Sequence, residues 1–134
     1  MTQPILQAIL LCQDVKEDLP GFPGTSLFGI SSLLRIEPGE LHRFVNLWVY
    51  ARVVNVEGLC DFAITFANTE NESVIQRFSA EPIIIDDPRS PIEITQLMSS
   101  LSIHWPGRYE CRLYANSEFL GHTTLYVVEG SAAP

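Results

Sequence analysis

Basic residues are scarce in this chain. It has eight lysines and arginines in total against sixteen aspartates and glutamates, and Lys16 is the only lysine. The formal net charge at pH 7 is therefore −8. Binding to nucleic acid or to an anionic membrane depends on clustered positive charge that displaces counterions. We therefore expect neither nucleic acid nor a membrane surface among the partners.

Cysteine is also scarce. The three cysteines, Cys12, Cys60 and Cys111, each lie in an apolar stretch, and no two of them have the spacing of metal ligands. The N-terminus lacks the basic region and the cleavage site of a signal peptide. No segment approaches the roughly 18 apolar residues that a membrane-spanning helix needs. These absences predict buried, reduced thiols, no disulfide and a cytoplasmic protein.

Signatures of catalysis and of cofactor binding are missing as well. The segment 24–29 is one residue longer than the Gly-x-Ser-x-Gly motif of a serine nucleophile. The histidines His42, His104 and His122 share no metal-ligand spacing. The acidic turns lack the closely spaced aspartates of a calcium loop. We therefore expect no enzymatic activity, no metal and no cofactor.

What is present suffices for one folded domain. The length of 134 residues lies within the range of about 100–200 residues per domain. Roughly a third of the residues are Ile, Val, Leu or Phe, which is well above the share in disordered chains. We expect a single domain over residues 1–129. The small and polar residues 130–134 predict a flexible tail.

Apolar residues recur with a period of two. In residues 60–66 the even-numbered positions are large and apolar, as a half-buried strand requires. Residues 108–113 and 45–53 repeat this alternation. Turn-forming Pro, Gly, Asn and Asp separate such runs at intervals of about 8–15 residues, which favours an all-β sandwich or barrel over βαβ units.

Single segments refine this prediction. Asn116-Ser117 lies between two alternating runs and predicts a tight hairpin. Residues 26–36 are expected to form one strand. Residues 92–101 are compatible with a strand or, at residues 96–98, with a helical turn.

Tyr109 stands two residues before Cys111 and just after a turn that contains Gly107. Immunoglobulin-like sandwiches have a tyrosine corner in such a place, where the phenol bonds to an upstream backbone group. An ordinary half-buried strand tyrosine is the alternative. We predict an all-β, antiparallel immunoglobulin-like β-sandwich of about seven to nine strands without a disulfide, in which Tyr109 is a structural residue.

Three stretches resemble a family of bacterial β-sandwich domains of unknown function. They are residues 7–15, residues 26–30 and the closing residues 106–121, of which the closing stretch is the most specific. Family members have roughly the length of this chain. The resemblance implies a bacterial, cytoplasmic β-sandwich with no assigned activity and no catalytic residues.

The candidate functional residues lie on one side of the central strand. Opposite the aliphatic residues Val45 to Val53, this strand carries Phe44, Trp48, Tyr50 and Arg52. A two-layer sandwich buries only one side of each sheet, so these side chains meet solvent unless something covers them. Aromatic residues beside an arginine are typical of protein-interaction hot spots.

Several functions fit this pattern. The favoured hypothesis is a non-enzymatic protein-interaction or self-assembly module that holds another protein or a copy of itself. The alternative is a small-ligand or carbohydrate-binding sandwich with a pocket lined by Trp48 and Tyr50. Cover by a loop of the same chain is the purely structural explanation of these aromatic residues.

Overall fold

Strands account for all the regular secondary structure in the described part of the chain. The computed structural model describes residues 3–36 and 43–130. No helix occurs within these ranges, so residues 92–101 form a strand. The strands are β1 (Ile5–Leu19), β2 (Phe22–Ile30), β3 (Leu33–Ile36), β4 (Arg43–Val54), β5 (Gly58–Cys60), β6 (Phe62–Asn68), β7 (Ser73–Ser79), β8 (Ile83–Ile85), β9 (Ile92–Ile103), β10 (Gly107–Ala115) and β11 (Glu118–Glu129).

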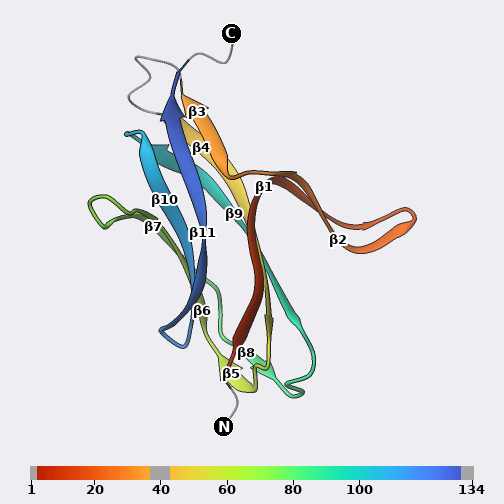
Figure 1. Ribbon diagram of the computed structural model, residues 1–134. Helices are drawn as coiled ribbons and strands as arrows, with labels where there is room; N and C mark the ends of the chain where they lie inside the picture. The colour runs from red at the N-terminus through yellow and green to blue at the C-terminus, as the bar shows by residue number, and fades with distance from the viewer. Residues whose placement is uncertain (1–2, 37–42, 131–134) are drawn as a thin grey trace.

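Two sheets form the body of the molecule (Figure 1). The first is four-stranded, in the order β2-β1-β4-β9, and the second is five-stranded, in the order β3-β11-β10-β6-β7. Paired neighbours are antiparallel except for β3, which runs parallel to β11. The predicted antiparallel all-β sandwich is confirmed. The two sheets contain nine strands, and the small ribbon of β5 and β8 brings the total to eleven.

The strand connections are those of an immunoglobulin-like sandwich. Such domains place strands A, B and E in one sheet and C, F and G in the other. Here β1, β4 and β9 are neighbours in the first sheet, and β6, β10 and β11 are neighbours in the second. No disulfide joins the sheets, because Cys12, Cys60 and Cys111 are all free.

The core lies between the two sheets. Side chains at alternate positions of β4 and β9 pack against those of β6, β10 and β11, which buries apolar area from water and stabilises the sandwich. The alternation predicted for β4 and β10 is thus present. The most deeply buried core residues include Leu11, Val49, Val53, Phe66, Met98, Leu101, Ile103, Tyr109, Cys111, Leu113, Leu125 and Val127.

The turn between β10 and β11 has the predicted form. Ala115 pairs with Glu118, which leaves the two residues Asn116 and Ser117 as the loop. Both have positive φ, 50° and 68°, as the tight hairpin turns that match strand twist require. The predicted hairpin is confirmed.

Residues 26–36 do not form one strand, and this prediction is wrong. The chain leaves the first sheet at Ile30 and resumes as β3 beside β11 in the second sheet. Ser31 secures the change of sheet, because its N–H donates to the Leu11 carbonyl at 2.8 Å and its hydroxyl donates to the Gly29 carbonyl at 3.0 Å. Sequence periodicity does not report such a crossing, since both pieces keep an extended backbone.

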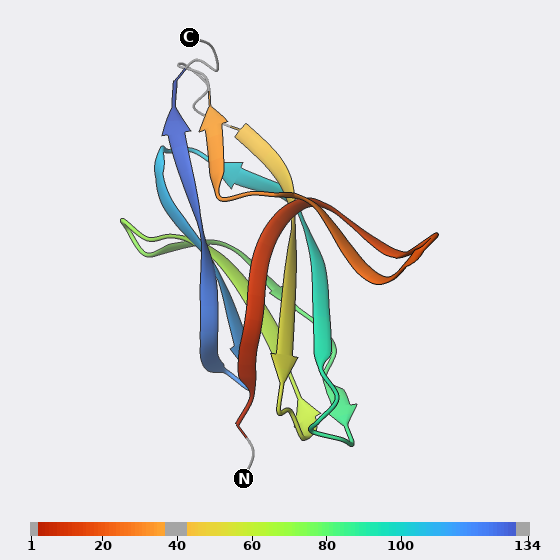
Figure 2. The ribbon, with the colours of Figure 1, turned by 45° about the vertical axis from the view of Figure 1, so that its right-hand side comes forward.

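The hairpin of β1 and β2 extends away from the sandwich body (Figure 2). Up to Cys12, β1 pairs with β4, and beyond it β1 pairs with β2 alone. Phe22, near the tip, is 68% exposed. One hydrogen bond links this hairpin to the far edge of its own sheet, from the Thr25 hydroxyl to the Glu93 carboxylate at 3.3 Å.

Candidate functional site

Trp48, Tyr50 and Arg52 lie on the outer side of the four-stranded sheet. Their neighbours Val49 and Ala51 are fully buried in the core, so the alternate residues of β4 point the other way. Trp48, Tyr50 and Arg52 are each half-buried. The backbone of Phe44 pairs with Ser102, and the side chain of Phe44 lies outside the described residues.

Trp48 belongs to a line of apolar residues that crosses the whole sheet. Cys12 is paired with both Ile30 and Trp48, and Trp48 is paired with Leu97. Directly paired residues point to the same side of a sheet. We call this line, Ile30, Cys12, Trp48 and Leu97, the Trp48 row. Ile30 is 62% exposed and Leu97 is 38% exposed, whereas Cys12 between them is fully covered.

Tyr50 and Arg52 are held in place beside the Trp48 row. The Tyr50 hydroxyl donates to the Glu93 carboxylate of β9, and Arg52 Nε donates to Gln7 Oε1 of β1 at 3.0 Å. Burial raises the pKa of Tyr50, and the neighbouring Glu93 raises this pKa further. The row is therefore bordered by polar side chains with fixed positions.

The three thiols are buried, and their pKa values are raised. Burial raises the pKa of Cys12 and of Cys60, and it raises the pKa of Cys111 to about 12. Only the thiolate reacts readily, so a raised pKa slows modification. Cys111 Sγ lies 4.0 Å from the thioether sulfur of Met98, deep in the core.

We expect the native protein to react slowly with a chromogenic disulfide reagent at pH 8. At a pKa of about 12 instead of 9.0, the thiolate fraction of Cys111 falls about a thousandfold. Absorbance should then count few thiols in the native state and all three after denaturation. Rapid reaction of Cys111 in the native protein would contradict this prediction.

A second group of side chains, which the sequence did not indicate as a site, lies on the outer side of the five-stranded sheet. Glu110 is its centre. Glu110 accepts hydrogen bonds at 2.9 Å from both Arg108 and Arg112, and His122 Nε2 lies 3.4 Å from its carboxylate. Arg112 also reaches Glu72 at 3.3 Å. We call these five residues the Glu110 cluster.

Two aromatic rings extend the Glu110 cluster to the solvent. Phe119 is 53% exposed, stacks on His122 with a centroid distance of 6.3 Å, and contacts Tyr114 edge-on at 5.7 Å. Together with Glu72, Glu110 and Arg112, these residues line a shallow hollow of about 420 Å³. The sequence showed only that Glu110 and Arg112 alternate with apolar residues. It did not show that Glu72, a turn residue 40 positions before Arg112, reaches the same point.

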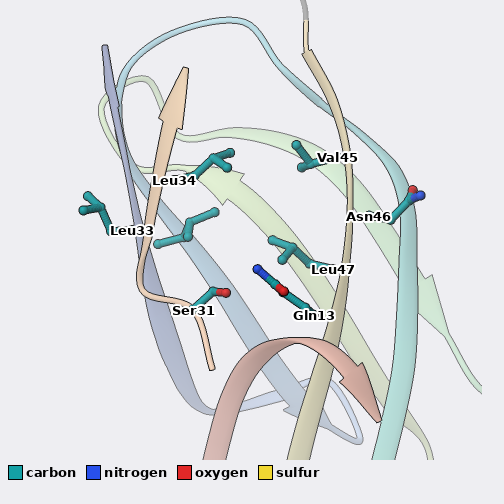
Figure 3. Close-up of a pocket in the computed structure, with 8 residues that line it drawn as sticks. Gln13, Ser31, Leu33, Leu34, Val45, Asn46 and Leu47 are labelled. Atoms are coloured by element: carbon teal, nitrogen blue, oxygen red, sulfur yellow. The ribbon is translucent and has the colours of Figure 1, made fainter. Parts of the chain in front are cut away.

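Another hollow, of about 450 Å³, lies between β3 and β4 (Figure 3). In Figure 3 the side chains of Gln13, Leu34 and Leu47 point toward this space, whereas those of Leu33 and Asn46 point away from it. Five of the eight lining residues are leucine or valine, and the other three, Gln13, Ser31 and Asn46, are polar. The two strands are joined by residues 37–42, which lie outside the described part.

The sequence indicated no metal ligands. Within residues 3–36 and 43–130, no group of three or more His, Cys, Asp or Glu residues has a geometry suited to holding a metal ion. His42 lies outside these ranges. His104 accepts or donates a hydrogen bond with Ser102 at 2.6 Å, and His122 belongs to the Glu110 cluster.

Tyr109 has the geometry of a tyrosine corner. Its side chain is 1% exposed, and its hydroxyl donates to the Trp105 carbonyl at 2.6 Å. The ring stacks on Phe66 with a centroid distance of 5.5 Å and an interplanar angle of 12°. The phenol therefore ties the start of β10 to the turn before it.

Comparison with known proteins adds little to this description. No family model matches the chain, and no curated protein matches it. In structure the chain is similar to an immunoglobulin-like protein of Pseudomonas aeruginosa, with 8% sequence identity and a TM-score of 0.42, over 94% of this chain and 97% of that one. The assignment of an immunoglobulin-like sandwich therefore depends on the strand connections of this chain itself.

The described part of the chain contains no helix of the length and hydrophobicity that crossing a membrane would require.

Proposed function

We propose that this protein is a non-enzymatic binding domain that holds another protein, or a copy of itself, through the outer side of its four-stranded sheet. The observation that carries the proposal is the Trp48 row, to which each of four neighbouring strands contributes one apolar residue. Three separate, buried cysteines suit a reducing compartment, which supports a cytoplasmic location.

The energetics favour association at this surface. Apolar area removed from water contributes about 25 cal/mol per Å², and large aromatic side chains dominate such interfaces. A chain with a net charge of −8 is otherwise kept dispersed by self-repulsion, so association depends on a local patch. Because Tyr50 and Arg52 are already held by Glu93 and Gln7, little side-chain entropy is lost when a partner binds.

The carbohydrate-binding alternative has less support at this surface. A sugar site needs a concave pocket with an aromatic platform and several polar groups. Trp48 and Tyr50 line neither of the hollows of about 420 and 450 Å³. The exposed Phe119 beside the Glu110 cluster is the better platform for such a ligand.

Two aspartate variants test the proposal. We expect Trp48→Asp and Ile30→Asp to lower the solution mass toward the 15.0 kDa chain, or to abolish capture of a protein that the wild-type domain retains. A charge placed in the buried part of an interface costs several kcal/mol of binding free energy. Sedimentation and mass spectrometry of captured proteins provide the readout.

Tyr126→Asp is the matched control, because Tyr126 is 52% exposed on β11 in the other sheet. Ile30 is more exposed than Trp48, so Ile30→Asp is less disruptive to the fold. It therefore separates a loss of binding from a loss of folding. If Trp48→Asp lowers only the melting temperature and Ile30→Asp changes neither mass nor capture, the row is covered by its own chain and the proposal is wrong.

A further inference from the structure

Strand β9 is the last strand of the four-stranded sheet and has a hydrogen-bonded neighbour on one side only, β4. An immunoglobulin-like sandwich of the constant type has a further strand, D, beside the strand that corresponds to β9. Here the three-residue strand β8 pairs with β5 instead. The position beside β9 is therefore not filled by any described strand of this chain.

The other sheet edges carry features that discourage pairing with a foreign strand. Charged residues, proline and short length are the usual ones. Strand β2 contains Pro23, β3 has only four residues and includes Arg35, and β7 contains Arg77. Strand β9 is twelve residues long and contains no proline, lysine or arginine. It is the longest edge strand of the described molecule, and Glu93 is its single charged residue.

The regular part of this edge is short and well defined. A bulge opposite Asn46, where Ser100 has a φ of 55°, interrupts the pairing with β4. Residues 92–98 pair with β4 without interruption. The midpoint of this regular segment is Thr95.

One backbone carbonyl of β9 accepts a hydrogen bond from a side chain of the same strand. Gln96 Nε2 donates to the Leu97 carbonyl at 2.9 Å. Strand β4 fills the other side of β9 and leaves no room there for a side chain to reach this carbonyl. The Leu97 carbonyl therefore points to the open side of β9. Backbone groups two residues apart along a strand point the same way, which places the N–H and carbonyl of Thr95 on the open side too.

We propose that β9 pairs antiparallel with β9 of a second copy of this chain, about a twofold axis at Thr95. This pairing rests on the proposed function, in which the four-stranded sheet binds another protein or a second copy, and it specifies the second copy as the partner. The pairing would join the two four-stranded sheets edge to edge and place both Trp48 rows on one continuous surface. A self-complementary edge gives a closed dimer.

The charges of the edge suit a second copy. The only charged residue of β9 is Glu93, whose carboxylate is already bonded by Tyr50 and Thr25. In the proposed register Glu93 lies opposite Leu97 of the partner and not opposite another glutamate, while Thr95 lies opposite Thr95. Like charges directly opposite would destabilise the pair, whereas two threonines stabilise it. Two strongly acidic chains can therefore meet here without opposed carboxylates.

Two variants at the twofold axis test the proposal. Sedimentation of the wild-type protein should show a species of about twice the 15.0 kDa chain mass. Thr95→Pro removes the N–H on the open side and should give a monomer with unchanged circular dichroism, because proline is tolerated where the N–H is not bonded to the sheet. Thr95→Cys, which replaces a partly exposed side chain with one of similar size, should form a disulfide-linked dimer under mild oxidation.

Ser79→Cys is the control for cross-linking, since Ser79 is an exposed residue of the edge strand β7. A monomeric wild-type protein, or cross-linking of the Thr95→Cys variant no faster than that of the Ser79→Cys variant, overturns the proposal. If Thr95→Pro leaves a dimer intact that Trp48→Asp and Ile30→Asp dissociate, the sheet surface keeps its proposed function and only the edge pairing is wrong. If the wild-type protein is a monomer that captures another protein, and Thr95→Pro abolishes this capture, then a strand of that other protein pairs with β9 instead of a second copy.

Discussion

Glu110→Ala should lower the free energy of unfolding by about 2–3 kcal/mol. The Glu110 side chain is 12% exposed and accepts bonds from two guanidinium groups, one of which, that of Arg112, is only 18% exposed. Removal of the carboxylate leaves that guanidinium covered and without its main partner. Urea denaturation of the two proteins measures the difference.

Glu72→Ala is the matched control, because Glu72 bonds the same Arg112 but is 68% exposed. An exposed ion pair contributes about 0–1 kcal/mol and is screened by salt. We therefore expect a small loss for Glu72→Ala that disappears at high salt, and a loss for Glu110→Ala that persists. Equal losses for the two variants would show that the cluster is a set of ordinary surface ion pairs.

Tyr109→Phe should destabilise the fold by about 1–2 kcal/mol. The substitution keeps the ring that stacks on Phe66 and removes only the hydroxyl that donates to the Trp105 carbonyl at 2.6 Å. The Trp105 carbonyl would lose the hydrogen bond from a phenol whose residue is only 1% exposed. Thermal and urea unfolding, with the m-value checked for constancy, give the difference in stability.

Tyr114→Phe serves as the comparison within the same strand. Tyr114 lies on the outer side of β10, is half-buried, and contacts Phe119 through its ring, which the substitution keeps. We expect a change within about 0.5 kcal/mol, as for most surface substitutions. Indistinguishable effects at the two positions would mean that the Tyr109 hydrogen bond contributes nothing to stability.

The candidate site was only partly accessible to sequence reasoning. Alternation along β4 correctly separates Val49 and Ala51 from Trp48 and Tyr50, because a strand turns successive side chains to opposite sides. The partners of these residues come from other strands. Glu93 is 43 residues from Tyr50, and Gln7 is 45 residues from Arg52. Contacts of this kind depend on register between strands, which the pattern within one strand does not contain.

The Glu110 cluster shows the same limit. Alternating polar residues of β10 indicate an outer side, and the sequence gives no reason to single out Glu110 from Arg108 or Arg112. The register of β10 with β11 brings His122 opposite Arg112, and the turn after β6 brings in Glu72. A nearly buried carboxylate beside two guanidinium groups and an imidazole arises only when three separate segments are assembled.

By itself, the sequence determined most of the strands and of the turns between them, the buried and unpaired cysteines and the tyrosine before Cys111, because each follows from a local pattern of side chains or backbone preference. Tertiary structure alone decided where the chain changes sheets after Ile30, that β8 pairs with β5 and leaves the edge of β9 open, and which distant residues meet at Trp48 and Glu110. These features depend on which strands become neighbours. That choice is made by packing the two apolar sides of the sheets together, and it combines residues too far apart in the chain for any local pattern to relate.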